Sequence, residues 1–139
     1  MIWIKNNQLN KYEGQFGELY LSTGTGNWQK EDGQTYQGEW ERGKRNGYGK
    51  GTWPNGESYQ GEWKDDQWNG QGIYIWAYGH SYQGQWKNNN RHGLGRYTYS
   101  SGQYLEGQWK DSKQVGEHKK YSKEGALLEN ITYEEGKRK

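Results

Sequence analysis

The chain has 139 residues and a formal net charge of +2, and only 28% of its residues are hydrophobic. Thirteen tyrosines and nine tryptophans stand against one phenylalanine, so large amphipathic rings must supply most of the buried surface. The absence of cysteine excludes disulfides and thiolate metal sites, and no apolar run approaches the roughly 20 residues of a membrane-spanning helix. We therefore expect a cytoplasmic protein.

The first segment of the chain carries an irregular copy of a motif that recurs further along. Residues 1–11 are expected to form an N-terminal cap, in which residues 1–4 add an edge strand. YEGQF at 12–16 is the first copy of the motif, offset by 24 residues from the next copy. The segment 17–26 carries one extra residue, which predicts a bulge or a longer turn there.

From residue 36 the same motif returns every 23 residues. YQGEW stands at 36–40 and 59–63, YQGQW at 82–86 and LEGQW at 105–109. In the copy at 59–63, Tyr59, Gly61 and Trp63 alternate with polar residues, which predicts a strand with one aromatic face. Residues 64–69 predict a polar turn, and residues 70–76 a second strand with its glycines and aromatic residues on the same face. Glycines at 33, 56, 79 and 102 predict tight turns with positive φ.

These elements make each unit a β-hairpin that pairs with the next hairpin. The sequence predicts an all-β fold, an elongated single-layer antiparallel meander of about five to six tandem hairpins, twisted or grooved, with atypical ends. The units fall near 12–35, 36–58, 59–81, 82–104 and 105–117 onward, and each advances the sheet by roughly 10 Å. Glycine pairs such as Gly70 and Gly72 are expected to leave room for the rings of the neighbouring strand.

After residue 117 the repeat loses its pattern. His118 stands where the second glycine is expected, and Asn130 and Thr132 stand where the next glycine and tryptophan are expected. Residues 118–139 are therefore expected to form a degenerate repeat with a basic tail, which covers the last sheet edge as strand or short helix.

The motif Tyr-x-Gly-x-Trp, followed by a polar turn, Gly-x-Gly, an aromatic residue and a turn glycine, resembles the MORN (membrane occupation and recognition nexus) repeat over residues 12 to about 117. The resemblance implies a single-layer grooved sheet that docks a partner segment in a cytoskeletal, ciliary or membrane-associated assembly. It also implies an association with phosphoinositides. Some members of that family carry an enzyme domain beside the array, and this sequence contains none.

The aromatic face is the candidate site for a protein partner, which we expect to be a helix or an extended peptide. The same rings are also the natural core of a one-layer sheet, and both roles can hold together. The predicted groove residues are Tyr36, Trp40, Tyr59, Trp63, Tyr74, Trp76, Tyr82, Trp86, Tyr97, Tyr99 and Trp109.

An alternative site is a basic rim, because lysines recur just after the motif tryptophan. An anionic membrane would attract such a rim, although a solvated rim that discourages sheet association is the simpler interpretation, since aspartates lie among these lysines. The predicted lipid-binding residues are Lys64, Lys87, Arg91, Lys110 and Lys113. A third alternative is an architectural spacer, or an array that associates with itself.

Nothing in the sequence favours catalysis, a cofactor or a metal. The three histidines, His80, His92 and His118, fall in or near predicted turns without the spacing of a metal pair. There is no nucleophile elbow and no phosphate-binding loop. The small net charge does not favour nucleic acid as a partner. We expect a protein that is not an enzyme.

Overall fold

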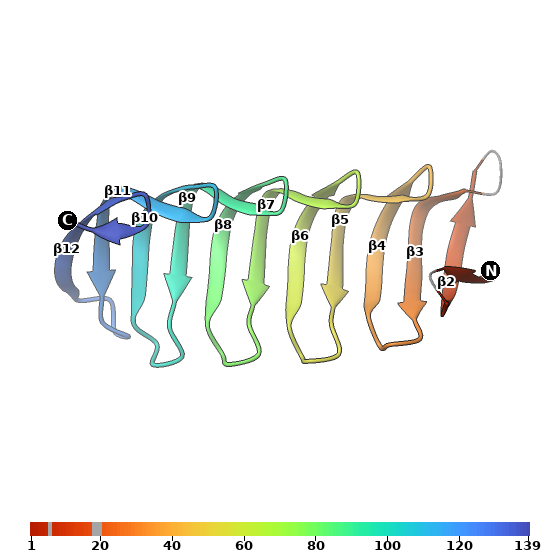
Figure 1. Ribbon diagram of the computed structural model, residues 1–139, viewed down its shortest axis with the longest axis horizontal. Coiled ribbons are helices and arrows are strands. Elements are labelled where there is room, and N and C mark those ends of the chain that lie inside the picture. Colours follow the sequence, from red (N-terminus) through yellow and green to blue (C-terminus); the bar gives the residue numbers. More distant parts are fainter. Residues whose placement is uncertain (6, 18–20) are drawn as a thin grey trace.

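The structure, a computed structural model, describes residues 1–5, 7–17 and 21–139. Over these residues the chain forms one antiparallel sheet, in which each strand pairs with its neighbours in sequence (Figure 1). The strands are β1 (Ile2–Lys5), β2 (Gln8–Phe16), β3 (Ser22–Lys30), β4 (Thr35–Glu41), β5 (Lys44–Thr52), β6 (Ser58–Lys64), β7 (Gln67–Ile75), β8 (Ser81–Lys87), β9 (Asn90–Thr98), β10 (Tyr104–Lys110), β11 (Lys113–Tyr121), β12 (Leu127–Glu134) and β13 (Lys137–Arg138).

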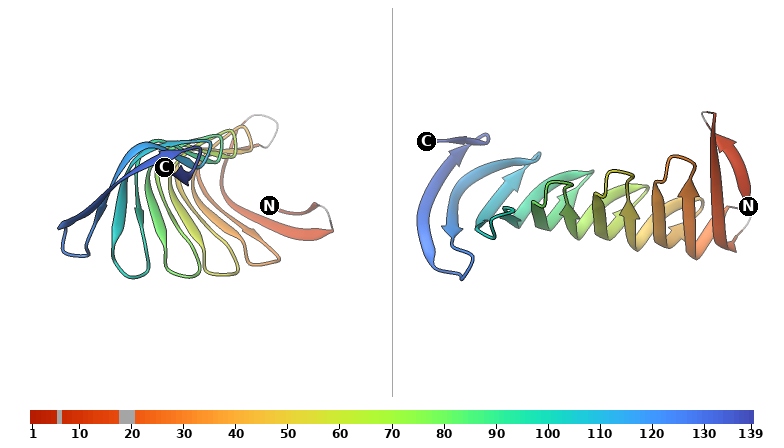
Figure 2. Two further views of the ribbon diagram at one scale, coloured as in Figure 1. Left: turned by 60° about the vertical axis from the view of Figure 1, so that its left-hand side comes forward. Right: turned by 90° about the horizontal axis from the view of Figure 1, so that it is seen from below.

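The sheet is a single layer with the two chain ends at opposite ends of its long axis (Figure 1). The hairpins lie side by side along that axis, and the strands bend along their length (Figure 2). The described residues contain no helix. The predicted all-β hairpin meander is therefore confirmed, and the C-terminal segment is strand rather than helix.

The two long edges of the sheet carry different turns. On one edge, turn glycines such as Gly56 (φ 89°) take positive φ, as predicted, and so do Gly33, Gly79, Gly102 and Gly125. On the other edge, two residues suffice: Asp65 and Asp66 have φ of 48° and 67°, the left-handed conformation of a type I′ turn. The polar turn predicted for residues 64–69 is therefore too long. Strand β7 begins at Gln67, and Trp68 belongs to the sheet.

A β-bulge interrupts each pairing between a motif strand and the next strand along the chain. Between β6 and β7, Gly61 pairs with Gly72 but Trp63 pairs with Trp68, so β7 carries extra residues. A carboxylate on the opposite face from the rings closes this bulge, since Glu62 Oε2 accepts the Gln71 backbone N–H at 2.5 Å. Glu39 does the same for Tyr48 one repeat earlier. The repeating outward carboxylate is therefore a backbone cap.

Replacing Glu62 by alanine should lower the free energy of unfolding by about 1 kcal/mol, because the bulge N–H loses a charged acceptor. Gln60→Ala is the matched control, since Gln60 is exposed on the same strand and face. Urea unfolding of both variants measures the difference. Equal midpoints for the two variants would show that the carboxylate does not stabilise the bulge.

The first hairpin contains the irregularity that its extra residue predicts. Strands β2 and β3 change register between Gly14 and Gln15, which is a bulge. The alternative, a longer turn, falls on residues 18–20 and lies outside the described residues. The predicted N-terminal edge strand is confirmed, because β1 pairs with β2 from Ile2 to Lys5.

The C-terminal end repeats the architecture with one residue inserted. The register between β11 and β12 shifts at Lys120 and Tyr121, and His118 pairs with Ile131 and Gly116 with Tyr133. The repeat's glycine and tryptophan positions are thus taken by Ile131 and Tyr133. The alignment that placed Asn130 and Thr132 there is wrong by one residue, because the sequence did not reveal the shift.

Candidate functional site

The motif tyrosines lie flat across pairs of glycines on one side of the sheet, which we call the aromatic face. The ring of Tyr59 covers Gly61 and Gly72, and a Cβ atom at Gly72 would overlap it. Its hydroxyl donates to the carbonyl oxygen of Glu62 at 2.8 Å, and the side chain is 0% exposed. Only glycine permits this close approach at Gly72, as predicted. Gly70, the other glycine of the predicted pair, has a φ of 97° in the bulge, and a Cβ atom there would meet the Glu62 carboxylate rather than a ring, so the prediction for Gly70 is wrong.

Three motif tryptophans, Trp40, Trp63 and Trp86, each join their repeat to the one before it. Trp63 Nε1 donates to the Gly49 carbonyl oxygen at 3.0 Å, in the preceding strand of the sheet. Trp40 and Trp86 make the equivalent bonds to the preceding repeats. Each of these indoles therefore buries its ring and satisfies its only polar atom at once, as buried tryptophan requires.

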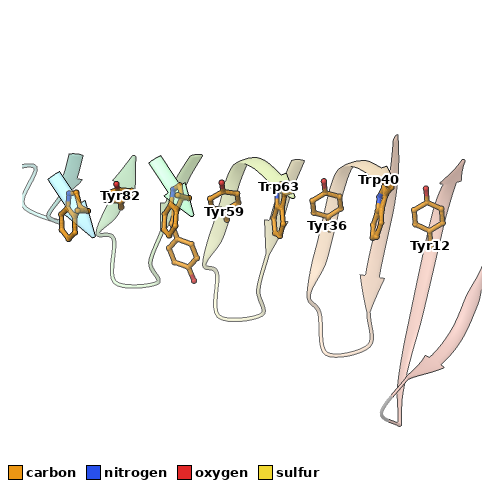
Figure 3. Packing of buried hydrophobic residues seen from close by; sticks show 9 residues of the cluster. Tyr12, Tyr36, Trp40, Tyr59, Trp63 and Tyr82 are labelled. Atoms are coloured by element: carbon orange, nitrogen blue, oxygen red, sulfur yellow. The ribbon is translucent and has the colours of Figure 1, made fainter. Parts of the chain in front are cut away.

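Tyrosine and tryptophan rings alternate in one continuous row along the ribbon (Figure 3). From Tyr12 to Trp109, successive ring centroids are 5.1–5.5 Å apart and the ring planes are 80–90° apart. Edge-to-face pairs of this kind add about 0.5–1.5 kcal/mol each beyond the burial of their surface. The row replaces the second layer that an ordinary sheet would need for its core.

A leucine and a histidine continue the row where the motif changes. Leu105 stands at the tyrosine position, and the ring of His118 fills the space over Gly107 instead. His118 Nε2 donates to the Gln108 carbonyl oxygen at 2.8 Å, three residues after Leu105, where the other repeats use a tyrosine hydroxyl. The His118 ring also packs edge-on against Trp109 and Tyr133. The two substitutions compensate each other, so the row extends into β12.

Burial lowers the pKa of His118, against the smaller opposing effect of its hydrogen bond to the Gln108 carbonyl oxygen. The unfolded chain then binds a proton more readily than the folded one, so stability is complete above the unfolded pKa of about 6.5 and falls below it. We expect the melting temperature to drop between about pH 7 and 5 by more in the wild type than in His118→Gln. Parallel thermal melts across this range would contradict the assignment.

Most of the predicted groove residues are core. Eight of the eleven are at most 9% exposed and belong to one packed cluster, so they have the core role that the sequence also allowed, and partner contact by them stays a prediction. They are buried because a ring lying flat on the sheet and edge-on to two neighbours has no free face. The eight are Tyr36, Trp40, Tyr59, Trp63, Tyr74, Tyr82, Trp86 and Trp109.

The rings that keep part of their surface lie beside this row. Trp76, Tyr97 and Tyr99, all predicted, are half-buried. Partner contact by these three rings remains a prediction. Trp53 and Trp68, which were not among the predicted groove residues, are half-buried beside them. We call this set the aromatic band: Trp53, Trp68, Trp76, Tyr97 and Tyr99.

Polar groups at the band are fixed by hydrogen bonds. His80 Nδ1 lies 2.8 Å from the Tyr97 hydroxyl, and Glu57 accepts from the Tyr74 hydroxyl at the equivalent place one repeat earlier. Burial raises the pKa of Tyr97 to about 12. The Tyr97 ring is therefore neutral at physiological pH and its hydroxyl can donate a hydrogen bond.

Two arginines lie across the aromatic face. The guanidinium of Arg45 lies 4.7 Å from the Trp63 ring, and that of Arg91 lies 4.6 Å from the Trp109 ring. Arg91 was predicted on the basic rim, and this placement is wrong because its side chain packs on the rings. Trp68 occupies the same repeat position between them. The signal was available in the 23-residue spacing of Arg45, Trp68 and Arg91, but the turn predicted for residues 64–69 concealed it.

The other rim residues are exposed beside the two-residue turns, along one edge of the sheet. They are Lys64, Lys87, Lys110 and Lys113. Lipid contact by these lysines remains a prediction. No helical segment of the described residues has the length and apolar character of a membrane span. The residues that the structure describes also contain no cluster of three metal-ligating side chains.

At the N-terminal end, the aromatic face is hollowed. A depression of about 300 Å³ lies between Trp3, Trp28 and Trp40, with the Arg45–Asp66 ion pair on its wall. The face therefore offers a recess at one end and the aromatic band further along. This arrangement suits contact with an elongated ligand, such as a helix or an extended peptide, better than enclosure of a small molecule.

The family model of the MORN repeat matches residues 36–58, 59–81, 82–104 and 106–117. The chain belongs to the MORN-repeat family. MORN repeats are non-enzymatic modules that generally interact with proteins or membranes. A comparison of this MORN-repeat chain with curated proteins gave no match. The contacts of the matched repeats also occur at Tyr12, which covers Gly14 and Gly26 outside the matched residues.

Proposed function

We propose that this MORN-repeat chain is a non-enzymatic scaffold subunit whose aromatic face docks a helix or extended segment of a partner protein. The observation that carries the proposal is the aromatic band, a set of half-buried rings beside the fully packed aromatic row. Clustered rings that remain accessible on a protein surface are typical of protein contact sites.

The rigidity of the band supports this function. Trp68 stacks on the buried Tyr59 ring with a 16° interplanar angle, and Trp76 lies 4.8 Å from the buried Tyr74 ring. The accessible rings are therefore held by the core row and lose little side-chain entropy on binding. A pre-organised surface of this kind gains affinity because less ordering is needed in the complex.

The assembly that we propose for the chain is cytoplasmic and cytoskeletal, ciliary or membrane-associated, in keeping with the general role of MORN repeats. No catalytic group is assigned, and we propose that the chain is not an enzyme. The hydroxyl, carboxylate and imidazole groups near the band are engaged with one another, as in Tyr97 with His80 and Tyr74 with Glu57.

A second candidate is a peripheral membrane module that binds anionic lipids. The observation in its favour is the row of exposed lysines Lys64, Lys87 and Lys110 on one edge, where each charge near an anionic surface contributes about 1 kcal/mol. Asp65, beside Lys64, and Asp111, beside Lys110, reduce the net charge of this edge. A spacer or self-associating array is a third candidate. The observation in its favour is that β13 pairs with only two residues of β12, so most of the β12 edge is open to another strand.

Affinity capture from the source cell's lysate tests the proposal. We expect Trp76→Ala/Tyr99→Ala to lose a partner that the wild type retains both at about 0.15 M salt and at higher salt, since apolar contacts are weakly screened. Tyr48→Ala is the control, because Tyr48 is 55% exposed on the opposite face. Loss of all binding at higher salt, reproduced by Lys64→Glu/Lys87→Glu/Lys110→Glu, would favour the membrane module instead.

A further inference from the structure

Arg45, Trp68 and Arg91 hold the same position in three successive repeats, and a turn residue of the following repeat caps each of them. Asp66 Oδ1 accepts the Arg45 backbone N–H at 2.8 Å, and Asn89 Oδ1 accepts that of Trp68 at 2.8 Å. Ser112 Oγ accepts the Arg91 backbone N–H at 3.1 Å. The backbone arrangement is the same, but the capping side chain changes from charged to neutral.

This change leaves the two arginines in opposite electrostatic states. The Asp66 carboxylate that caps Arg45 also accepts a hydrogen bond from Arg45 Nε at 3.0 Å. The positive charge of Arg45 is therefore neutralised by an ion pair. Ser112 carries no charge, and Arg91 Nη2 donates only to the backbone carbonyl oxygen of Ser112, at 2.8 Å. Among the described residues, no carboxylate lies within ion-pair distance of Arg91.

Arg91 is half-buried among aromatic rings. Its guanidinium lies 4.6 Å from the Trp109 ring, 5.7 Å from Trp76 and 5.9 Å from Tyr97. The aromatic faces stabilise the cation in part. Its N–H groups are fixed in a planar fork whose geometry matches a carboxylate. Arg91 is therefore a half-buried positive charge without an acidic partner, set among the rings of the aromatic band.

We propose that Arg91 is the position at which the aromatic face binds an acidic side chain of a partner protein segment. The carboxylate of an aspartate or glutamate would engage the guanidinium fork, while apolar side chains of the same segment cover Trp76 and Tyr97. This inference rests on the proposed function, and it adds the charge that the partner must carry. Arg45, already neutralised by Asp66, would not select for an acid.

The repeat spacing predicts where apolar side chains of the segment should lie relative to its acid. Trp68 is one repeat nearer the N-terminus than Arg91, a separation of roughly 10 Å along the ribbon. A segment running along the ribbon spans this distance in about three residues if extended and about seven if helical. An apolar residue at that separation from the acid would reach Trp68.

Selection of peptides from a display library of random sequences, with the full chain immobilised, tests the inference. We expect enriched peptides to share one aspartate or glutamate at a fixed separation from apolar residues. Against a synthetic copy of one such peptide, Arg91→Met should weaken binding at least tenfold by calorimetry, and the control Arg45→Met less than threefold. Changing the peptide's acid to its amide should cause a similar loss in the wild type but little further loss in Arg91→Met. Thermal melts check that both variants fold.

The outcomes separate the inference from the proposed function. Enriched peptides without a shared acid, or equal losses in Arg91→Met and Arg45→Met, would overturn the role of Arg91 and leave the docking face intact. If no peptide is enriched, the docking function itself is contradicted and the inference falls with it. Binding to phosphatidylserine or phosphoinositide vesicles that Arg91→Met abolishes would assign the cation to lipid and overturn the peptide proposal.

Discussion

Replacing Tyr59 by alanine is expected to lower the free energy of unfolding by about 3–5 kcal/mol, enough to unfold a marginally stable domain. The ring is 0% exposed, covers Gly61 and Gly72, and contacts the motif tryptophans of two repeats. Its removal leaves a cavity that the rigid glycine backbone cannot fill, and it breaks the aromatic row in the middle. Urea unfolding followed by circular dichroism measures the loss.

Two further variants assign that loss to the ring. Tyr59→Phe keeps the ring and removes the hydrogen bond to the Glu62 carbonyl, so it should cost about 1 kcal/mol. Tyr48→Ala removes a tyrosine that is 55% exposed and should change stability by no more than about 0.5 kcal/mol. Similar effects of Tyr59→Ala and Tyr48→Ala would contradict the assignment of the motif tyrosine to the core.

The exchange of tyrosine and glycine for Leu105 and His118 predicts a strong coupling between these two positions. Leu105→Tyr alone places a second ring where His118 already lies, and overpacking of this kind costs about 1–3 kcal/mol. His118→Gly alone removes the ring that covers Gly107 and leaves a cavity beside Trp109. The double variant rebuilds the tyrosine-over-glycine packing of Tyr82 and should be at least about 2 kcal/mol more stable than the two single effects predict.

A double-mutant cycle by chemical denaturation measures this coupling. Leu105→Tyr combined with Glu117→Ala serves as the control, because Glu117 is exposed beside His118 and outside the row. Additive effects of Leu105→Tyr and His118→Gly would show that the two residues do not share one space.

The fold could be predicted from the sequence because the residues that determine each strand and turn recur at the same positions in several repeats. The Tyr59, Gly61 and Trp63 alternation specifies a strand face, and turn glycines such as Gly56 specify the positive φ of one edge. The other edge was predicted poorly, since Asp65 and Asp66 adopt a left-handed turn without the glycine that usually indicates one. Because of this error the predicted turn was too long, and Trp68 was not recognised as a strand residue of the aromatic face.

The candidate site was harder to predict than the fold. Alternation places Tyr59 and Trp76 on the same face, but it does not indicate which ring lies flat on glycine and which keeps an open surface. The Tyr59 ring lies over Gly61 and Gly72 and is buried, whereas Trp76 lies beyond the strand's glycines, near the turn. The role of Arg91 depends on the side chain of Ser112, which is 21 residues away and approaches it only through the register of the hairpins.

Nuclear magnetic resonance of the tryptophan indole N–H groups tests the central claim most directly, because core and band are distinguished in one spectrum. On addition of a display-selected peptide, we expect shifted signals for Trp53, Trp68 and Trp76. The signals of Trp40, Trp63 and Trp86, whose indole N–H groups are bonded to backbone carbonyls, should move little. A peptide that binds without moving the Trp53, Trp68 and Trp76 signals would contradict docking on the aromatic face.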